Sequence, residues 1–393
     1  MTTKAARASA AIYFDYASTS PVASDVAAAM SDCLTMDGTF ANPASRSHIY
    51  GWQAEEKVET ARLQVADLLH CDSREIVWTS GATESNNLAI KGVFEAATTA
   101  GENQGHLITS VIEHKAVIDP VKWLQHKGVD VTWLVPDVHG VISAEQVNAA
   151  LRPDTRLVSI MHVNNETGVI NPIADIGRVC RDQGVLFHVD AAQAAGKLEV
   201  DVERLGADFL SLSAHKFYGP KGVGCLYVRR SVAARLAPQI HGGGHERRLR
   251  SGTLPTHQLV GMGAAAELAK AGLIDEMTRI ALLRDKLWLG IKDLPGAVQN
   301  GAGADIGPIH LNVRFSGVDG EMLLLSLRQL ALSSGSACTS ASMEPSYVLK
   351  AMGLSDADAH SSLRLSLGRF TTDADVEQAI EHICKTITVL QAA

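Results

Sequence analysis

Short apolar segments alternate with helix-like segments through the first two thirds of the 393-residue chain. Seven of the apolar segments have strand character: 75–79, 106–110, 129–134, 157–162, 185–189, 209–213 and 222–228. Stretches with helical periodicity, such as 84–97 and 173–183, separate most of them. This alternation favours a mostly parallel sheet with helices on both faces, and wholly apolar strands suit burial on both sides. We therefore predict an α/β fold built on a mostly parallel, seven-stranded sheet.

The alternation stops near Arg230, and a second pattern follows it. A glycine-rich segment at 241–247 and a long helical stretch from 257 to about 289 come before a smaller set of strand and helix segments. A chain of this length normally forms two domains. We expect the boundary inside the long helix. The predicted division is a large domain at 17–265 and a smaller α+β domain formed by residues 1–16 and 266–393.

A further helical period lies near the N-terminus, at 51–69. Its apolar positions place Trp52, Val58 and Val65 on one face, which is the pattern of a helix that packs against a core.

Composition excludes several classes of protein. A hydrophobic fraction of 46% with 20% charged residues is typical of a soluble globular protein, and a net charge of -8 disfavours nucleic acid as the main partner. The N-terminal segment lacks the apolar core of a secretory signal, and no apolar run is long enough to cross a bilayer. The six scattered cysteines form no Cys-x-x-Cys pair, so we expect neither a zinc site nor disulfides and predict a cytoplasmic protein.

The strand at 209–213 ends on a histidine and a lysine, His215 and Lys216, and a breaker-rich turn follows at 217–222. A lysine at the tip of a buried strand loses hydration, which lowers the pKa of its amine. Such an amine can bind an aldehyde cofactor as a Schiff base. An ordinary surface lysine is the alternative, and polar residues at neighbouring strand ends favour the reactive interpretation.

Asp190 follows the strand at 185–189. A buried carboxylate needs a positive partner, and a protonated pyridine nitrogen would serve. Gln193 could then hydrogen-bond the phenolic oxygen of the same ring. The alternative is an aspartate that caps a helix N-terminus.

Candidate binding residues follow two more strands: one set could bind an anion, and the other could contact a ring. At 79–84 small residues let backbone N–H groups and the Thr83 hydroxyl approach an anion at a helix start, although small residues cap many helices. His114, after the strand at 106–110, could stack on a ring and carry protons, or be structural.

Two residues are candidates for substrate binding. Asn165, after the strand at 157–162, could bind a substrate carboxylate or the phenolic oxygen. Arg364, in the strand at 362–366, has the fork geometry of a carboxylate grip, with a surface ion pair as the alternative.

The segment at 333–342 consists almost wholly of small residues and contains Cys338. Such a loop cannot bury enough apolar surface to be held rigidly. Structural cysteines are normally buried in apolar surroundings, so Cys338 is predicted to be the reactive one.

Together these residues resemble the cysteine desulfurases, in the fold-type I, class V branch of pyridoxal 5'-phosphate (PLP) enzymes. The resemblance runs almost without gaps from Tyr13 to about Leu390, and its most specific parts are 42–48, 213–216, 241–253 and the loop around Cys338. That loop is similar to the long-loop group, with the bacterial housekeeping members of iron–sulfur cluster assembly closest. The resemblance implies a fold-type I PLP-dependent transferase.

The resemblance also implies a role for each candidate. The residues implied to bind the cofactor are Ala82, Thr83, His114, Asn165, Asp190, Gln193, Ser213, His215, Lys216 and Thr253. Among them Lys216 carries the Schiff base, and Thr253 reaches the phosphate of the other subunit, which implies a homodimer. Asn165 and Arg364 bind the substrate carboxylate. The implied catalytic residues are Lys216, Cys338 and His114, with no resident metal, although Cys338 could transiently ligate an iron–sulfur cluster held by a partner.

The implied reaction converts L-cysteine to L-alanine and leaves the sulfur as a persulfide on Cys338. The acceptor could be an iron–sulfur scaffold, a tRNA-thiolation protein or a thio-cofactor pathway. Two alternatives stay open: a selenocysteine lyase or cysteine sulfinate-type enzyme, and a non-catalytic sulfur-relay scaffold.

Three positions depart from the family pattern. Ala214 stands where the family usually has glycine, and Ala192 stands where it usually has threonine, which removes a hydroxyl near the cofactor. The sequence ends at Ala393, where housekeeping relatives carry a further segment that helps to dock the scaffold, so that partnership is left open.

Overall fold

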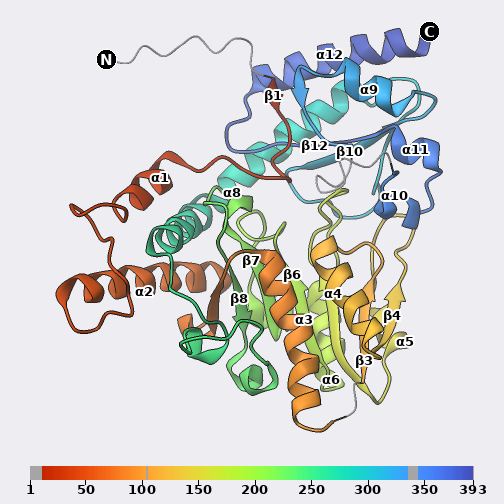
Figure 1. Cartoon of the computed structure of the whole chain (residues 1–393). Coiled ribbons are helices and arrows are strands. Elements are labelled where there is room, and N and C mark those ends of the chain that lie inside the picture. The colour runs from red at the N-terminus through yellow and green to blue at the C-terminus, as the bar shows by residue number, and fades with distance from the viewer. Residues whose placement is uncertain (1–10, 103–104, 335–343, 393) are drawn as a thin grey trace. The chain divides into compact units, whose positions relative to one another are not determined.

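The computed structural model describes residues 11–102, 105–334 and 344–392. The chain divides into two compact units. Unit 1 contains the N-terminal residues up to Ser18, Glu166–Gly168, and the chain from Ile274 onward; unit 2 contains Thr19–Asn165 and Val169–Leu273. Helix α8 (Thr256–Ile291) runs from one unit into the other (Figure 1). The division at residues 265 and 266 stays a prediction about the folding domains.

Unit 2 is built on a seven-stranded sheet with the order β2-β8-β7-β6-β5-β3-β4. The strands are β2 (Ile76–Thr79), β3 (His106–Ser110), β4 (Asp130–Leu134), β5 (Thr155–Met161), β6 (Leu186–Asp190), β7 (Phe209–Ser213) and β8 (Gly224–Val228). β8 is antiparallel to both of its neighbours, and the other pairings are parallel. The predicted mostly parallel, seven-stranded sheet is therefore confirmed.

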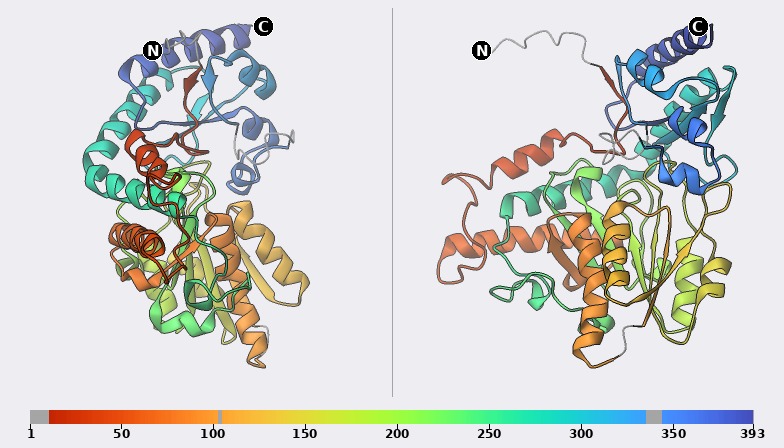
Figure 2. Two further views of the ribbon diagram at one scale, coloured as in Figure 1. Left: turned by 60° about the vertical axis from the view of Figure 1, so that its left-hand side comes forward. Right: turned by 45° about the vertical axis from the view of Figure 1, so that its right-hand side comes forward.

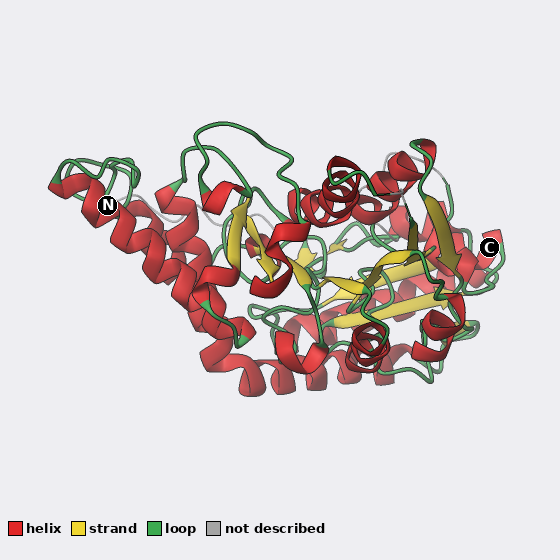
Figure 3. Ribbon diagram, turned by 90° about the horizontal axis from the view of Figure 1, so that it is seen from below, coloured by secondary structure: helices red, strands yellow, loops and turns green. Residues whose placement is uncertain are grey.

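Helices lie on both faces of this sheet (Figure 3). The helices that lie wholly within unit 2 are α1 (Ser24–Ser31), α2 (Ile49–Leu69), α3 (Ala82–Thr99), α4 (Lys115–His126), α5 (Ala144–Ala150), α6 (Ile173–Asp182) and α7 (Val202–Leu205). Apolar side chains of α3 and α4 pack with the strands in one buried cluster that includes Leu88, Phe94 and Val121. Burying one such side chain stabilises the fold by about 1.5–3 kcal/mol.

Unit 1 has two small sheets. Three antiparallel strands take the order β12-β10-β9, and a parallel pair joins β1 to β11. The strands are β1 (Ile12–Tyr13), β9 (Ala297–Gln299), β10 (His310–Phe315), β11 (Leu330–Ala331) and β12 (Ser362–Ser366). The helices are α9 (Gly320–Ser326), α10 (Tyr347–Ala351), α11 (Asp356–His360) and α12 (Asp373–Ala392). Figure 2 shows the red β1 among the blue elements, so β1 and the C-terminal helix α12 belong to one unit.

Trp52 differs from its expected position. The helical period of α2 is correct, but Trp52 is 52% exposed, whereas Val58 and Val65 are buried. Its indole N–H donates to the backbone oxygen of Arg46 at 2.7 Å. Across the described ranges, no helix is both long enough and apolar enough to span a bilayer.

Candidate functional site

The direction of the strands determines at which edge of the unit 2 sheet the candidate polar residues lie. β2, β7, β6, β5 and β3 end at the same edge, whereas the antiparallel β8 begins there. Thr79, the last residue of β2, pairs with Gly224, which in turn pairs with Ser213, the last residue of β7. The turn after β2 is thus placed beside the end of β7, at the edge where ligands of open α/β sheets bind.

Two glycines allow the turn after β2 to approach β7 closely. Gly81 has φ 148°, a conformation that side chains rarely adopt, and a Cβ atom there would lie 3.5 Å from the Ser213 hydroxyl. A Cβ atom on Gly224 would lie 2.6 Å from the Cα of Gly81. Thr83, in the first turn of α3, is exposed. Backbone groups, the Ser213 hydroxyl and the N-terminus of α3 therefore come together at the end of β2, an arrangement that suits an anion.

Asp190 ends β6 and is 6% exposed. Asn86 Nδ2 donates to its Oδ2 at 2.7 Å, and the backbone N–H of Ala192 donates to its Oδ1 at 3.0 Å. Because both donors are neutral, they orient the carboxylate without balancing its charge, which fits a cationic ligand atom. The Ala192 bond comes from the backbone, so the absence of the family's threonine side chain does not remove it.

His114 is the residue before α4, and its Nδ1 accepts a hydrogen bond from the Ala116 N–H at 3.1 Å. The neutral ring therefore carries its proton on Nε2. Burial lowers the pKa of His114; the charge of Asp190 opposes that shift and the charge of Lys216 adds to it. Both charges act on His114, so the fold brings His114, Asp190 and Lys216 together.

Lys216 lies in a short turn of helix after β7 and is half-buried. Its neighbour His215 lies 3.1 Å, Nδ1 to Oγ1, from Thr19, and the Ser20 hydroxyl donates to the His215 backbone oxygen at 2.9 Å. Burial, together with the positive charges of Lys216, Lys221 and Lys197, lowers the pKa of His215 to about 4. Such a concentration of positive charge around a neutral imidazole favours an anionic ligand.

The remaining predicted residues are distributed over both units. In unit 2, Gln193 Oε1 accepts from the buried Lys197 amine at 2.9 Å, Asn165 is buried, and Thr253 is exposed. Arg364 belongs to unit 1, where its buried guanidinium donates to Asp15 Oδ1 at 2.7 Å. Cys338 lies outside the described residues.

Sequence reasoning missed two buried polar residues at this edge of the sheet. One is Asn86, which holds Asp190 and lies one turn beyond Ala82 in α3. The other is Glu113, whose Oε1 accepts from the Ser110 hydroxyl at 2.7 Å and from the Met161 N–H at 3.1 Å. Burial raises the pKa of Glu113 to about 8. Polar residues at buried positions of a helix or strand end were the available signal for both.

Ala214 is accommodated by its surroundings. It is fully buried, and a Cβ atom on Gly219 would lie 2.8 Å from its methyl group. The glycine at 219 thus leaves the space that the alanine methyl occupies.

Known proteins resemble this chain along nearly its whole length. The family "Aminotransferase class-V" matches residues 12–379. Proteins named cysteine desulfurase IscS from Shewanella baltica (strain OS223) and Shewanella oneidensis are each 57% identical over 380 residues, which is 97% of this chain and 93% of theirs.

Solved structures agree in fold. A NifS-like protein superposes with a TM-score of 0.88 and 37% identity, covering 97% of this chain and 100% of its own. SspA in complex with cysteine has a TM-score of 0.81 and 43% identity, with coverage of 92% and 99%. An apo cysteine desulfurase from Thermococcus onnurineus NA1 has a TM-score of 0.85 and 25% identity, with coverage of 97% and 95%.

Proposed function

The chain belongs to the class-V aminotransferase family and, within it, to the cysteine desulfurases, and on that premise we propose that the residues at the carboxyl edge of the unit 2 sheet hold its PLP. The observation that carries this assignment is that Asp190 ends β6, that Lys216 follows the neighbouring parallel strand β7, and that the charges of both act on His114. The family itself fixes the activity as that of a PLP-dependent cysteine desulfurase.

The residues present fit each part of the cofactor. The turn at Gly81 and Thr83, beside Ser213, suits the phosphate, and the lysines near His215 supply positive charge. Ala82 begins α3 and contributes a backbone donor from its first turn. Asp190, oriented by neutral donors, suits a protonated ring nitrogen.

Four further residues are proposed to contact the cofactor. Gln193 would donate its amide N–H to the phenolic oxygen, because its Oε1 already accepts from Lys197. His114 would stack on the ring, and Asn165, which follows β5, lies at the same edge of the sheet. His215, kept neutral by its surroundings, is a hydrogen-bonding partner of the phosphate.

Bound PLP withdraws electrons from the Cα of an attached amino acid, which makes the Cα proton acidic. The protein then has three tasks. The Lys216 amine would hold the cofactor covalently and would accept the Cα proton of the substrate. The Asp190 carboxylate would keep the pyridine nitrogen protonated, because the pairing of opposite charges favours the protonated form. The imidazole of His114, with its proton on Nε2, is a second proton carrier beside Lys216.

Sulfur transfer is proposed to use Asn165 of unit 2 together with Arg364 and Cys338, which belong to unit 1 by their place in the chain. Asn165 and Arg364 would bind the carboxylate of L-cysteine. The Cys338 thiolate attacks the substrate sulfur, so that a new S–S bond forms as the C–S bond breaks. The products are a persulfide on Cys338 and, after protonation at carbon, L-alanine. The acceptor of this sulfur is proposed to be an iron–sulfur scaffold, a tRNA-thiolation protein or a thio-cofactor pathway, and a reducing cytoplasm is the proposed setting.

We further propose a homodimer in which Thr253 reaches the phosphate of the partner subunit. Thr253 is exposed, as this role requires. Unit 2 also exposes large apolar side chains around the start of α2: Leu34, Met36, Phe40, Ile49, Tyr50 and Trp52. An exposed apolar patch of this kind is characteristic of a protein–protein contact.

The proposal is tested by incubating the purified protein with L-cysteine and mapping persulfide by mass spectrometry. We expect the added sulfur on Cys338 and an equal amount of L-alanine. A protein that is colourless as purified would favour the non-catalytic scaffold. Faster turnover of selenocysteine or cysteine sulfinate than of cysteine would favour the related lyases.

A further inference from the structure

An ion pair lies directly beside the proposed phosphate-binding turn. Glu84 is in the first turn of α3, next to Thr83, and its Oε2 accepts from the Ser80 N–H at 2.8 Å. Arg250 Nε donates to Glu84 Oε1 at 2.8 Å, and Arg250 Nη2 donates to Oε2 at 3.2 Å. The side chains of Glu84 and Arg250 are only 15% and 18% exposed, so solvent screens this pair less than a surface pair.

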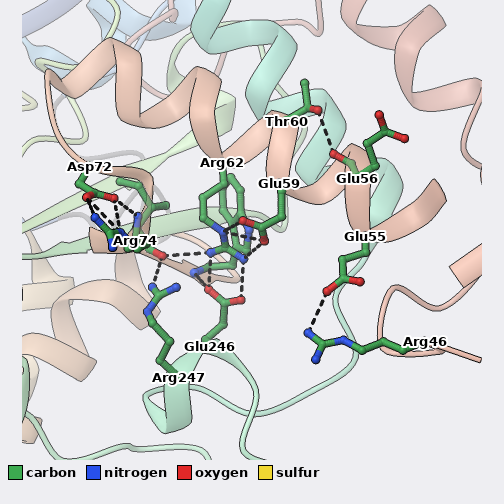
Figure 4. Close-up of polar contacts among 12 residues, drawn as sticks. Arg46, Glu55, Glu56, Glu59, Thr60, Arg62, Asp72, Arg74, Glu246 and Arg247 are labelled. Carbon is green, nitrogen blue, oxygen red and sulfur yellow. Dashed lines mark hydrogen bonds and ion pairs between the residues drawn. The ribbon is translucent and has the colours of Figure 1, made fainter. Parts of the chain in front are cut away.

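The segment that carries Arg250 is anchored to β2 by Glu246 (Figure 4). Arg62 donates to both oxygens of Glu246, at 2.7 and 2.9 Å, and the Trp78 N–H donates to Oε2 at 2.9 Å. The guanidinium of Arg62 also lies 5.2 Å above the ring of Trp78. Arg62 also donates to the Ile76 backbone oxygen at 3.0 Å. Because β2 is an edge strand, the bonds to Trp78 N–H and Ile76 C=O use backbone groups that no further strand pairs with.

The backbone of this segment takes an unusual course. Glu246, Arg247 and Arg248 have φ values of 46°, 54° and 69°, a left-handed run without glycine. Such conformations are costly and persist only where the surroundings hold them. The Arg62–Glu246 contact and a bond from Arg247 to the Ile76 backbone oxygen provide that hold. These contacts hold residues 246–248 in place, and the same segment carries Arg250 to Glu84.

The negative charge of Glu84 lies beside the site proposed for the phosphate, and Arg250 pairs with it. Burial alone would raise the pKa of Glu84, but the hydrogen bonds from Arg250 and Ser80 lower it, so the carboxylate is ionised at neutral pH. A negative charge in the first turn of α3 suits the helix dipole, yet it competes with a phosphate at the same N-terminus. Arg250 balances that charge.

We propose that Arg250 is a positioning and charge-balancing residue for the cofactor phosphate: it neutralises Glu84 and fixes the turn at 80–83 from the side of β2. The inference rests on the proposed placement of the PLP phosphate at Gly81, Thr83 and Ser213. It predicts that Glu84 opposes cofactor retention whenever Arg250 is absent.

The test measures the rate at which holoenzyme loses PLP to a scavenging apo-protein, followed by absorbance, in Arg250→Met, Glu84→Gln and the double variant. We expect Arg250→Met to lose PLP at least about threefold faster than wild type, the size expected for a partly screened charge. The double variant should return toward the wild-type rate, and Glu84→Gln should lose PLP no faster than wild type. Arg250→Lys, which keeps the charge, should restore most of the retention.

If Arg250 only stabilised the fold, the rates of PLP loss would rank the variants differently. The double variant would then lose PLP as fast as Arg250→Met or faster, and that result would overturn the inference. Glu276→Gln is the matched control, because Arg369 and Glu276 form a pair in unit 1 with similar exposure, 22% and 16%, and a 2.9 Å contact. Its PLP loss should equal that of wild type. If Lys216→Ala bound PLP with an unchanged spectrum, the proposed cofactor site itself would be wrong; if that site held and the order above failed, only this inference would be.

Discussion

Asn86, in α3, donates a 2.7 Å hydrogen bond to the carboxylate of Asp190, at the end of β6 and 104 residues away in sequence. Both side chains are buried, so the bond joins the helix that begins at the phosphate-binding turn to the proposed partner of the ring nitrogen.

We expect Asn86→Ala to weaken both stability and catalysis. Removing the amide leaves a buried carboxylate oxygen without its donor, which costs about 1–3 kcal/mol. Urea unfolding of the holoenzyme measures that loss, and steady-state kinetics with L-cysteine should show a lower kcat. Asn300→Ala is the control, because Asn300 is a buried asparagine of unit 1 whose amide donates to Asn312 and Ser362. Equal losses of kcat in the two variants would contradict the assigned role of Asn86.

Lys216→Ala should abolish the visible absorbance band that arises when an amine of the protein binds PLP covalently. The amine that forms this bond is missing in the variant, so PLP would be held by non-covalent contacts alone. Borohydride reduction followed by peptide mapping gives the second measurement, because it marks the modified lysine in the wild type. Lys221→Ala is the matched control: Lys221 also acts on His215, but its side chain is exposed. Retention of the band in Lys216→Ala would refute the assignment.

Cys338→Ser should keep the PLP absorbance and lose persulfide formation, since a hydroxyl cannot accept the sulfur. We expect sulfide release from L-cysteine in the presence of a reductant to fall by at least about two orders of magnitude, in line with the loss of a nucleophile. Cys384→Ser controls for thiol content, because Cys384 is a half-buried free cysteine whose pKa burial raises. Unchanged release in Cys338→Ser would place the reactive thiol elsewhere.

His188 predicts a pH dependence of stability. It is fully buried between the hydroxyls of Ser159 and Ser211, at 2.8 and 3.0 Å, and burial lowers its pKa to about 4. The unfolded chain binds a proton near pH 6.5, so the folded state loses stability as pH falls from about 6.5 toward 4, at about 1.4 kcal/mol per pH unit. His188→Asn removes the titrating group.

The measurement compares urea unfolding of wild type and His188→Asn between pH 7.5 and 5. The difference in unfolding free energy between the two proteins should shrink as the pH falls, because only unfolded wild type takes up a proton at residue 188 and is stabilised by it. A difference that stays constant across this range would show that His188 does not titrate on unfolding.

Local patterns in the sequence determined the elements and the edge at which the chemistry lies. Apolar runs and breakers placed β3 and β7 at their observed residues, and they put Asp190 at the end of β6 and Lys216 in the turn after β7. The α5 helix was missed although Ser143 and Gln146 form a capping box, because the helix is short and its apolar period weak. The helical period also placed Trp52 on the buried face of α2, where the fold exposes it.

Only the tertiary structure decided which strands and side chains become neighbours and hydrogen-bond partners. The register that sets Thr79 and Ser213 on either side of Gly224 follows from the antiparallel insertion of β8, which no local pattern encodes. The bonds of Asn86 to Asp190 and of Arg250 to Glu84 join residues more than a hundred positions apart. Periodicity and turn chemistry act over a few residues and so are readable from sequence, whereas a hydrogen bond between distant side chains exists only once the strand order has brought them within about 3 Å.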